Sequence, residues 1–392
     1  MSDFLSWLAW EVYFVFLEPA LVACGLAKIG LGDATYGRDA IPYSPTEREA
    51  IYENPAVQVT RRRVYLSRGI PILDMSLGSG KRPLPFMYNG MRVDAWINYY
   101  VWEMPEAVRQ HGLNADVYLV HGINEYSGRV IPQALVHMKH GFRTIAIDMP
   151  TYGRSSGLHS HLPTLRLNEG ALSAVMAHVR LCDENDQVPH FDKRYRLAQG
   201  GSMGGFSVVY HAALHPPNSS PSSLALDAVA VTAPMLLISP QTRPATWIEV
   251  IGRILSCFAG RLGLIRAIRG NLSDDPMVEL YARKDNQSYH GLVRVDTGLA
   301  VLSGLEHLNQ IAENIQCPIA IHHGSHDRVT DPEGSRIFFD RLHVRDKTLR
   351  IWPGWEHVMI KGYPGLSEKD LADRSKLLEE ISQWFIQRVR NA

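Results

Sequence analysis

Short apolar runs, each ended by loop residues, recur along the chain and predict its central architecture. They are DVYLVHG (116–122), RTIAID (143–148), YRLAQGGS (195–202), LDAVAVTA (226–233), PIAIHHGS (318–325) and TLRIWPG (348–354). Helical stretches, such as 171–182, separate them. Buried parallel strands with crossover helices show this pattern, because helices cover both faces of such a sheet. We therefore predict an α/β fold with a mostly parallel central sheet flanked by helices.

Three further segments complete this picture. In PFMYNGMRVDAWINYYVWE (85–103), Asn89-Gly90 supplies the positive φ angles of a two-residue hairpin, so we expect a strand pair at the sheet edge. The regular alternation fails between Pro234 and Cys317, which predicts an inserted helical cap. The amphipathic spacing from Leu366 to Val389 predicts a closing helix.

The N-terminal segment FLSWLAWEVYFVFLEPALVACGLA (4–27) is almost wholly apolar and long enough to cross a bilayer as a helix. A simple span is disfavoured, because Glu11 and Glu18 lie inside the segment and Pro19 breaks or kinks a helix. A signal peptide is disfavoured because Asp3 stands where a basic residue is expected. The aromatic side chains favour a helix lying in the membrane interface. Packing on the protein body or on a partner subunit is the alternative.

These patterns divide the chain into four predicted parts. Residues 1–32 form a hydrophobic membrane-associating segment and residues 33–80 an N-terminal extension. The core comprises 81–236 and 317–392, and the cap comprises 237–316.

Charge and cysteine content exclude several partners. Forty basic residues balance 40 acidic ones, so no global basic field gathers nucleic acid, and none is expected as a partner. The four cysteines form no C-x-x-C pair and have no histidine at zinc-site spacing. This argues against a cysteine-based zinc site or a disulfide framework, and we expect no metal and no cofactor.

The candidate chemistry centres on Gly200-Gly201-Ser202-Met203-Gly204-Gly205, between a predicted strand and a predicted helix. This is G-x-S-x-G in a strand-turn-helix setting, where glycines permit the sharp turn that exposes a serine hydroxyl. Ser202 is the predicted nucleophile. The alternative is an ordinary glycine turn without a catalytic role.

A serine nucleophile needs a base and an orienting acid, and this fold carries them in the chain order Ser, Asp, His. Asp327 and His357 each follow a predicted strand and have this order. Asp331 is a rival acid. The rival bases, which lie at the same strand end as the acid, are His322, His323 and His326.

The developing oxyanion needs backbone N–H donors. Met203, first in the predicted helix, supplies one, and Ile123, in the loop after DVYLV, is expected to supply the other. An ordinary turn at His121-Gly122 is the alternative.

Together these motifs resemble the monoglyceride lipase branch of the α/β-hydrolase fold, of the serine aminopeptidase S33 (Hydrolase_4) type. Five stretches from residue 116 onward carry the resemblance: HGINEYSGRV, IDMPTYGRSSGLHSHL, GGSMGG, GSHDRVTDPEGS and WPGWEHVMIKGYP. The resemblance implies a serine esterase for acyl glycerols or similar lipid esters, without a cofactor. It also implies a helical cap that dips into the membrane.

The resemblance assigns the triad to Ser202, Asp327 and His357, and the oxyanion donors to Ile123 and Met203. Substrate-binding roles fall on Glu125, Arg129 and, in the cap, Tyr281. For Glu125 and Arg129, four residues apart, an ion pair that holds the oxyanion loop is an equal alternative.

The chain departs from the family pattern in three places. Gly201 precedes the serine where the family usually has histidine, and Ile360 replaces a histidine found three residues after the catalytic one. An apolar residue there leaves an alcohol without a hydrogen-bond partner, which bears on monoacylglycerol preference. An N-terminal segment of roughly 80 residues is additional.

The predicted function is serine-dependent hydrolysis of lipid esters, most simply of monoacylglycerol to fatty acid and glycerol through an acyl-enzyme. One alternative is an acyltransferase, thioesterase or esterase for another acylated metabolite. A second alternative is a non-catalytic ligand-binding protein.

The expected location is a membrane, at the endoplasmic reticulum or a lipid-droplet surface, with the cytoplasm as alternative. WIEVIGRILSCFAGRLGLI (247–265) is either a lipid-docking helix or the inner face of the cap.

Overall fold

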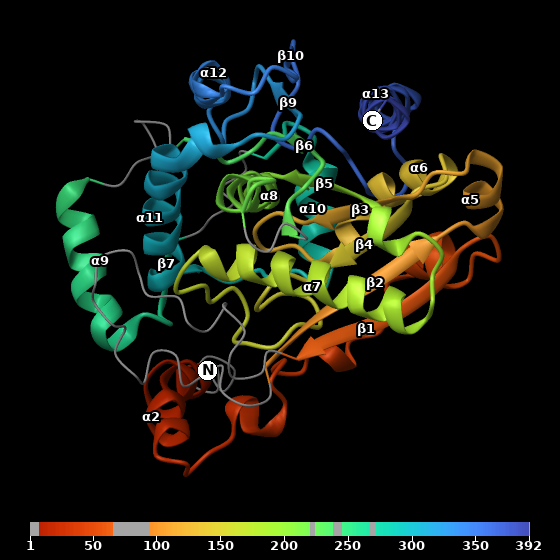
Figure 1. Cartoon of the computed structure of the whole chain (residues 1–392). Coiled ribbons are helices and arrows are strands. Elements are labelled where there is room, and N and C mark those ends of the chain that lie inside the picture. Colours follow the sequence, from red (N-terminus) through yellow and green to blue (C-terminus); the bar gives the residue numbers. More distant parts are fainter. Residues whose placement is uncertain (1–7, 66–94, 220–223, 238–244, 266–271, 392) are drawn as a thin grey trace.

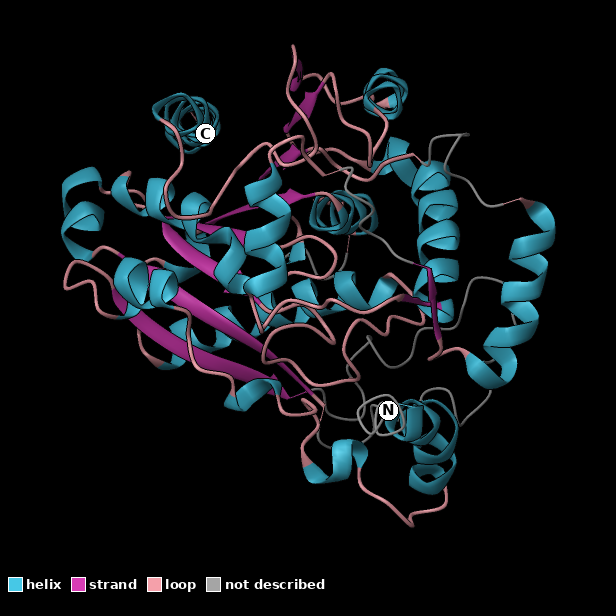
Figure 2. Ribbon diagram, turned by 180° about the vertical axis from the view of Figure 1, so that it is seen from behind, coloured by secondary structure: helices cyan, strands magenta, loops and turns pink. Residues whose placement is uncertain are grey.

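The computed structural model of the protein describes residues 8–65, 95–219, 224–237, 245–265 and 272–391. Its centre is an eight-stranded sheet in the order β1-β2-β4-β3-β5-β6-β9-β10, with helices on both faces (Figures 1 and 2). The strands are β1 Gln58–Tyr65, β2 Trp96–Glu103, β3 Ala115–Val120, β4 Arg143–Ile147, β5 Tyr195–Gly201, β6 Ala228–Thr232, β9 Ile319–Gly324 and β10 Lys347–Trp352. From β4 to β10 in that order the strands are parallel, so the six apolar runs are confirmed as a parallel sheet.

Two helical layers bury the faces of this sheet. One layer contains α7 (Arg166–Asn185), α8 (Met203–Leu214) and α12 (Pro332–Arg341), and its apolar cluster includes Val175, Val209 and Phe338. The other contains α6 (Ile131–Lys139) and the closing helix α13 (Glu368–Arg390), whose cluster includes Met138 and Phe385. Strands buried on both faces explain why the runs are continuously apolar.

The antiparallel edge of the sheet begins earlier in the chain than residue 81. β1 pairs with β2 along its whole length, from Gln58 opposite Glu103 to Tyr65 opposite Trp96. The hairpin turn predicted at Asn89-Gly90 lies outside the described residues. β1 does not show the apolar pattern that predicts the other strands, because it contains Arg61, Arg62 and Arg63. Charged side chains are common on an edge strand.

The predicted insertion lies between β6 and β9 and forms the cap. Its described elements are α9 (Thr246–Ala259), β7 (Gly263–Ile265), α10 (Pro276–Lys284), β8 (Val293–Arg294) and α11 (Val295–Ile311). β7 and β8 form a small antiparallel sheet. α11 packs closely on the core, since a Cβ at Gly304 would lie 3.2 Å from the ring of Phe206. α9 stands outside α11 at the periphery of the molecule (Figure 1).

The N-terminal segment is helical from residue 8, and its hydrogen bonding changes just before Pro19. The π-helix η1 (Tyr13–Leu17) leads into α2 (Glu18–Ala23), where Pro19 occupies the first turn. Because proline has no N–H to donate, the regular hydrogen-bond ladder cannot continue through it, and the π-helical turn ends directly before Glu18 and Pro19. Among the described residues, no helix is both long enough and apolar enough to cross a membrane.

Glu18 ties this segment to the rest of the molecule. Its buried carboxylate accepts hydrogen bonds from the Gly30 N–H at 2.7 Å and the Tyr36 hydroxyl at 2.8 Å, and pairs with Arg261 at 2.7 Å. Both views show the N-terminal helices beside the lower end of α9 (Figures 1 and 2). On the side that carries Glu18, the N-terminal segment therefore packs on the protein body, which is the alternative given by the sequence analysis.

Short helices fill the remaining connections. They are η2 Ile29–Gly32, η3 Arg38–Ala40, α3 Pro45–Glu47, η4 Arg48–Tyr52, α5 Pro105–His111, η6 Ser127–Val130, η7 Phe191–Lys193 and η9 Ala312–Asn314. The buried Arg38 donates to the carbonyls of Gly153, Ser155 and Gly157 at 2.7–2.9 Å. The region before β1 is therefore part of the folded body.

A buried ion cluster joins β3, β4 and α7. The guanidinium of Arg143 makes two bonds of 2.7 Å to Asp116, and bonds of 2.7 and 2.6 Å to Asp183. Both carboxylates are almost fully buried. Arg194 also reaches Asp116 at 3.1 Å, but Arg143 is the cation that bonds to both carboxylates and is their main counter-charge.

We expect Arg143→Met to lower the free energy of unfolding by about 3–5 kcal/mol, because it leaves buried carboxylates without their main counter-charge. The measurement is urea denaturation followed by circular dichroism. Arg62→Met removes the more exposed pair with Asp186 and serves as control, with an expected loss below about 1 kcal/mol. Equal losses in the two variants would contradict this account.

Candidate functional site

Ser202 lies in a strained turn between β5 and α8. Its φ of +51° is in the left-handed region, which favours glycine. The turn can close because a Cβ at Gly204 would lie 2.2 Å from the Val120 carbonyl oxygen, and one at Gly200 would lie 2.4 Å from the backbone of Gly204. The Ser202 N–H donates to the Thr232 carbonyl at 3.1 Å. The predicted strand-turn-helix geometry is therefore present.

Asp327 and His357 form the hydrogen-bonded pair that the sequence predicts. Asp327 Oδ2 lies 2.8 Å from His357 Nδ1, and Asp327 Oδ1 accepts from the N–H groups of Val329 at 2.7 Å and Thr330 at 2.9 Å. Burial alone raises the pKa of Asp327, but hydrogen bonds from His323 and His357 lower the pKa below its ordinary value. The acid is therefore ionised and holds the imidazole with its Nδ1 protonated.

The rival residues have other positions. Asp331 caps α12 by accepting the Glu333 N–H at 2.9 Å. Burial lowers the pKa of His322 to about 4, and its Nδ1 accepts the Trp352 indole N–H at 3.2 Å. His326 is exposed.

His323 has a supporting position that sequence reasoning missed. Its Nε2 lies 3.1 Å from Asp327 Oδ2 and its Nδ1 lies 2.7 Å from the Ser335 hydroxyl. The ring is fully buried behind the acid. Because an ionised carboxylate only accepts, His323 donates from Nε2. The sequence does place His323 at the same strand end as Asp327, but this position indicated only a rival base and not a partner of the acid.

The fold brings Ser202 to the same edge as this pair. β5, β6, β9 and β10 are neighbours and parallel, so the loops after them meet at one edge of the sheet. Thr330 bridges these loops, because its hydroxyl lies 3.2 Å from the Ala233 carbonyl and 3.3 Å from His357 Nδ1.

The loop after β3 lies against Ser202. A Cβ at Gly122 would lie 3.6 Å from Ser202 Cβ. His121 Nε2 accepts the Met149 N–H at 3.0 Å, so its protonated Nδ1 donates to the Gly122 carbonyl at 2.7 Å. Burial lowers the pKa of His121, consistent with a neutral ring. Because the peptide is trans, the Ile123 N–H points opposite to this tethered carbonyl.

Met203 is the first residue of α8 and is buried. The first N–H groups of a helix have no intrahelical acceptor, and the helix dipole favours negative charge there. The two predicted donors therefore lie in segments that adjoin Ser202: Met203 follows it in the chain, and Ile123 lies in the loop packed against it.

Glu125 holds the oxyanion loop, but not through Arg129. Glu125 Oε2 accepts the Gly122 N–H at 2.8 Å. Arg129 instead lies 3.8 Å from Asp285, at the end of α10, and 5.0 Å from the centre of the Tyr281 ring. The alternative of an ion pair between Glu125 and Arg129 is therefore wrong, and Arg129 instead joins the core to the cap. The Tyr281 hydroxyl donates to Thr46 at 3.4 Å.

Asp148, in the loop after β4, organises the segment that faces the oxyanion loop. Its buried carboxylate accepts from the Ser127 N–H, the Asn98 amide and the Arg154 N–H, each at 2.9 Å. A Cβ at Gly153 would lie 2.2 Å from this carboxylate, so only glycine fits there. In the stretch IDMPTYGRSSGLHSHL, Asp148 and Gly153 therefore have a structural role.

The site offers acid-base and nucleophilic groups in one place. Within the described part of the chain, the one group of histidine and carboxylate side chains with metal-binding spacing is Glu169, His211 and His215, between α7 and α8. It shares no residue with the edge that carries Ser202. The edge that carries Ser202 instead holds a serine, a histidine and an acid, the three groups that nucleophilic catalysis by serine requires.

Comparison with known proteins agrees with this geometry. The family model described as "Serine aminopeptidase, S33" matches residues 112–362, more than half of the chain. The chain is 24% identical to monoglyceride lipase of Rattus norvegicus over 70% of its length and 82% of that protein, and 22% identical to caffeoylshikimate esterase of Arabidopsis thaliana over 71% and 79%. It spans 27% of an abhydrolase domain-containing protein of Dictyostelium discoideum, at 24% identity.

Solved structures show the same fold. A soluble variant of monoglyceride lipase from Saccharomyces cerevisiae, in complex with a substrate analogue, superposes with a TM-score of 0.61 at 18% identity, over 75% of this chain and 92% of that chain. The monoacylglycerol lipase of Paleococcus ferrophilus gives a TM-score of 0.56 at 24% identity, over 70% and 94%. The chain thus belongs to the serine aminopeptidase S33 family, as a serine hydrolase of the lipase and esterase type with the α/β-hydrolase fold.

Proposed function

We propose that this protein hydrolyses carboxylic esters of lipids, and that monoacylglycerol is its substrate. The observation that carries the proposal is the Asp327–His357 pair, joined at 2.8 Å, at the sheet edge where the strained turn presents Ser202. An ionised acid that holds a histidine, at the edge of the sheet that also carries the serine, supports acyl transfer to serine with the histidine as the base.

In the proposed acylation step, the Ser202 hydroxyl oxygen attacks the ester carbonyl and His357 takes its proton. The negative charge on the carbonyl oxygen is stabilised by the N–H groups of Ile123 and Met203. The ester C–O bond then breaks, and His357 returns the proton to the departing glycerol oxygen. Asp327 stabilises the imidazolium throughout.

In the proposed deacylation step, His357 removes a proton from water, and the hydroxide attacks the acyl-enzyme. The same two N–H groups stabilise the second oxyanion. The proton returns to Ser202 as the fatty acid leaves. No metal or organic cofactor takes part in either step.

The names of the relatives support the proposal that the substrate is a lipid ester. The rat relative is a monoglyceride lipase, and one structural neighbour with that name holds a substrate analogue. Ile360 is half-buried against the apolar cluster beneath α6 and α13, so it offers no hydrogen bond to an alcohol. The proposed enzyme therefore binds the glycerol end through other groups, for which Glu125 and Arg129 are candidates.

We further propose that a membrane or lipid-droplet surface, most simply of the endoplasmic reticulum, is the site of action. α9 exposes large apolar side chains, with Trp247 65%, Phe258 62% and Ile254 58% exposed. The adjoining N-terminal helix exposes Trp10 and Phe16. Large apolar side chains exposed on two adjacent helices suit a surface that lies in the membrane interface.

Ser202→Ala and His357→Ala are each expected to abolish nearly all fatty acid release, and the double variant to be no worse, because the triad works as a unit. The measurement compares mono-, di- and triacylglycerol with a short-chain aryl ester in one detergent. Selective, Ser202-dependent cleavage of monoacylglycerol supports the proposal. Cleavage of the aryl ester alone moves the substrate to another acyl compound, and undiminished turnover in Ser202→Ala refutes the mechanism.

Glu125→Ala is expected to lower kcat roughly 10-fold to 100-fold, because the loop that presents the Ile123 N–H loses its tether at Gly122. Glu125→Gln keeps an oxygen acceptor and should stay within a few-fold of wild type. KM and kcat are measured with the aryl ester. A change in KM alone would instead indicate a direct substrate contact.

Trp247→Glu with Phe258→Glu is expected to weaken sedimentation with phosphatidylcholine vesicles at least 10-fold, while turnover of a water-soluble ester is retained. Ile337→Glu, at an exposed apolar position of α12, is the matched control and should bind as wild type does. Equal vesicle binding by all three proteins would remove α9 as a docking surface.

A further inference from the structure

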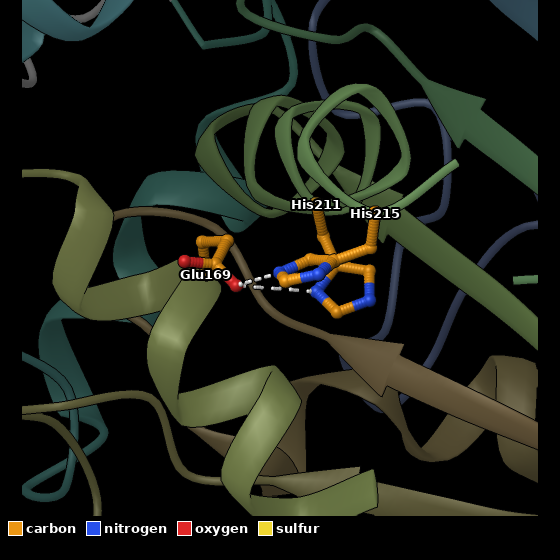
Figure 3. Close-up of side chains that lie close together, drawn as sticks. All are labelled: Glu169, His211 and His215. Carbon is orange, nitrogen blue, oxygen red and sulfur yellow. Dashed lines mark hydrogen bonds and ion pairs between the residues drawn. The ribbon is translucent and has the colours of Figure 1, made fainter. Parts of the chain in front are cut away.

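A cluster of polar side chains lies between α7 and α8 and is not used by the proposed reaction. Figure 3 shows Glu169 of α7 pointing toward His211 of α8 and toward His215, the residue that directly follows α8. The N–H of His215 donates to the carbonyl of His211, one turn earlier, at 2.9 Å. The side chain of His211 is fully buried, that of Glu169 is 8% exposed and that of His215 is 21% exposed.

The atoms of this cluster have separations close to those around a tetrahedral ion. Glu169 Oε1 lies 2.7 Å from His215 Nε2 and 3.6 Å from His211 Nδ1. The Ser173 hydroxyl lies 3.4 Å from each of these two nitrogens and 2.7 Å from Glu169 Oε1. Zinc bonds of about 2.0–2.1 Å at tetrahedral angles place neighbouring ligand atoms about 3.4 Å apart. Three separations match, and the two hydrogen-bonded ones must lengthen by roughly 0.7 Å.

The protonation of His211 is also suitable for a ligand. Its Nε2 lies 2.7 Å from the Leu224 carbonyl, which only accepts, so Nε2 carries the proton. The lone pair of Nδ1 therefore faces Glu169. A ring N–H bonded to a carbonyl is the usual support of a metal-binding histidine.

The carboxylate of Glu169 is buried beside the two imidazoles. Its Oε1 accepts a hydrogen bond from the Ser173 hydroxyl at 2.7 Å and lies 2.7 Å from His215 Nε2. A buried carboxylate with two imidazole nitrogens close to it is a ligand set that suits a divalent transition-metal ion.

We propose that Glu169, His211 and His215 form a structural binding site for a divalent transition-metal ion, for which Zn²⁺ is the best fit. The Ser173 hydroxyl, or a water reaching the half-exposed side of His215, completes the tetrahedron. Two nitrogen ligands and one carboxylate suit zinc, and its tetrahedral preference suits the observed separations.

The ion would join α7 to α8, the helix that begins directly after Ser202. His211 lies nine residues beyond Ser202, about 14 Å along the helix, so the ion takes no part in the ester chemistry. Its role is to hold the helix that supports the nucleophile turn. The site is independent of the proposed hydrolase activity and can be tested without a substrate.

The test uses full-length protein without a polyhistidine tag, stripped with EDTA and dialysed into metal-free buffer. Calorimetric titration with Zn²⁺ should give one ion per chain, and Co²⁺ should give the visible absorption of a tetrahedral site. Zn²⁺ should also raise Tm by roughly 2 °C or more at a large excess over Kd.

Glu169→Gln and His215→Gln should each weaken Zn²⁺ binding about 100-fold or more. His140→Gln is the control, because His140 pairs with Glu379 in a two-residue surface cluster at 2.6 Å. His215 is partly exposed, so its variant is expected to fold even where the Glu169 variant does not. No uptake by wild type, or equal uptake by wild type and His215→Gln, would show a purely hydrogen-bonded cluster and overturn the proposal.

Discussion

The close approach of three backbone segments at Ser202 is the constraint on which the site depends. α8 starts so near the end of β3 that a Cβ at Gly204 would lie 2.2 Å from the Val120 carbonyl oxygen. At this close approach Ser202 has its positive φ, and the loop after β3 lies against it. A larger residue at Gly204 or Gly200 would move the serine away from its oxyanion loop. The geometry of the nucleophile therefore depends on glycine, which has no Cβ, at positions 200 and 204.

Buried carboxylates position the remaining loops around that turn. Asp327 gathers donors from two histidines and from the loop that follows it, and Asp148 gathers three donors from three segments. Glu125 does the same for the oxyanion loop through Gly122. Each carboxylate loses its hydration on burial, so its loop is stable only in the conformation that supplies the replacement hydrogen bonds. These loops are thereby preorganised before substrate binds.

The N-terminal segment and the cap form one surface because a charged group joins them. Glu18, which made a membrane span improbable on sequence grounds, accepts hydrogen bonds inside the N-terminal region and pairs with Arg261 after α9. This leaves the apolar faces of both helices directed outward. Two segments about 240 residues apart in the chain, the N-terminal helix and α9 of the cap, thus expose apolar side chains on adjacent parts of the surface.

The sequence by itself determined the parallel sheet, the cap insertion, the nucleophile turn and the Asp327–His357 order, because apolar periodicity and glycine spacing are local signals. It could not show that β1 belongs to the sheet, since three arginines hide its pattern. It also could not pair Arg129 with Asp285, place His323 behind the acid, or bring Glu169 to His211 and His215. Those arrangements depend on contacts between elements far apart in the chain, and only the tertiary structure decides which side chains meet.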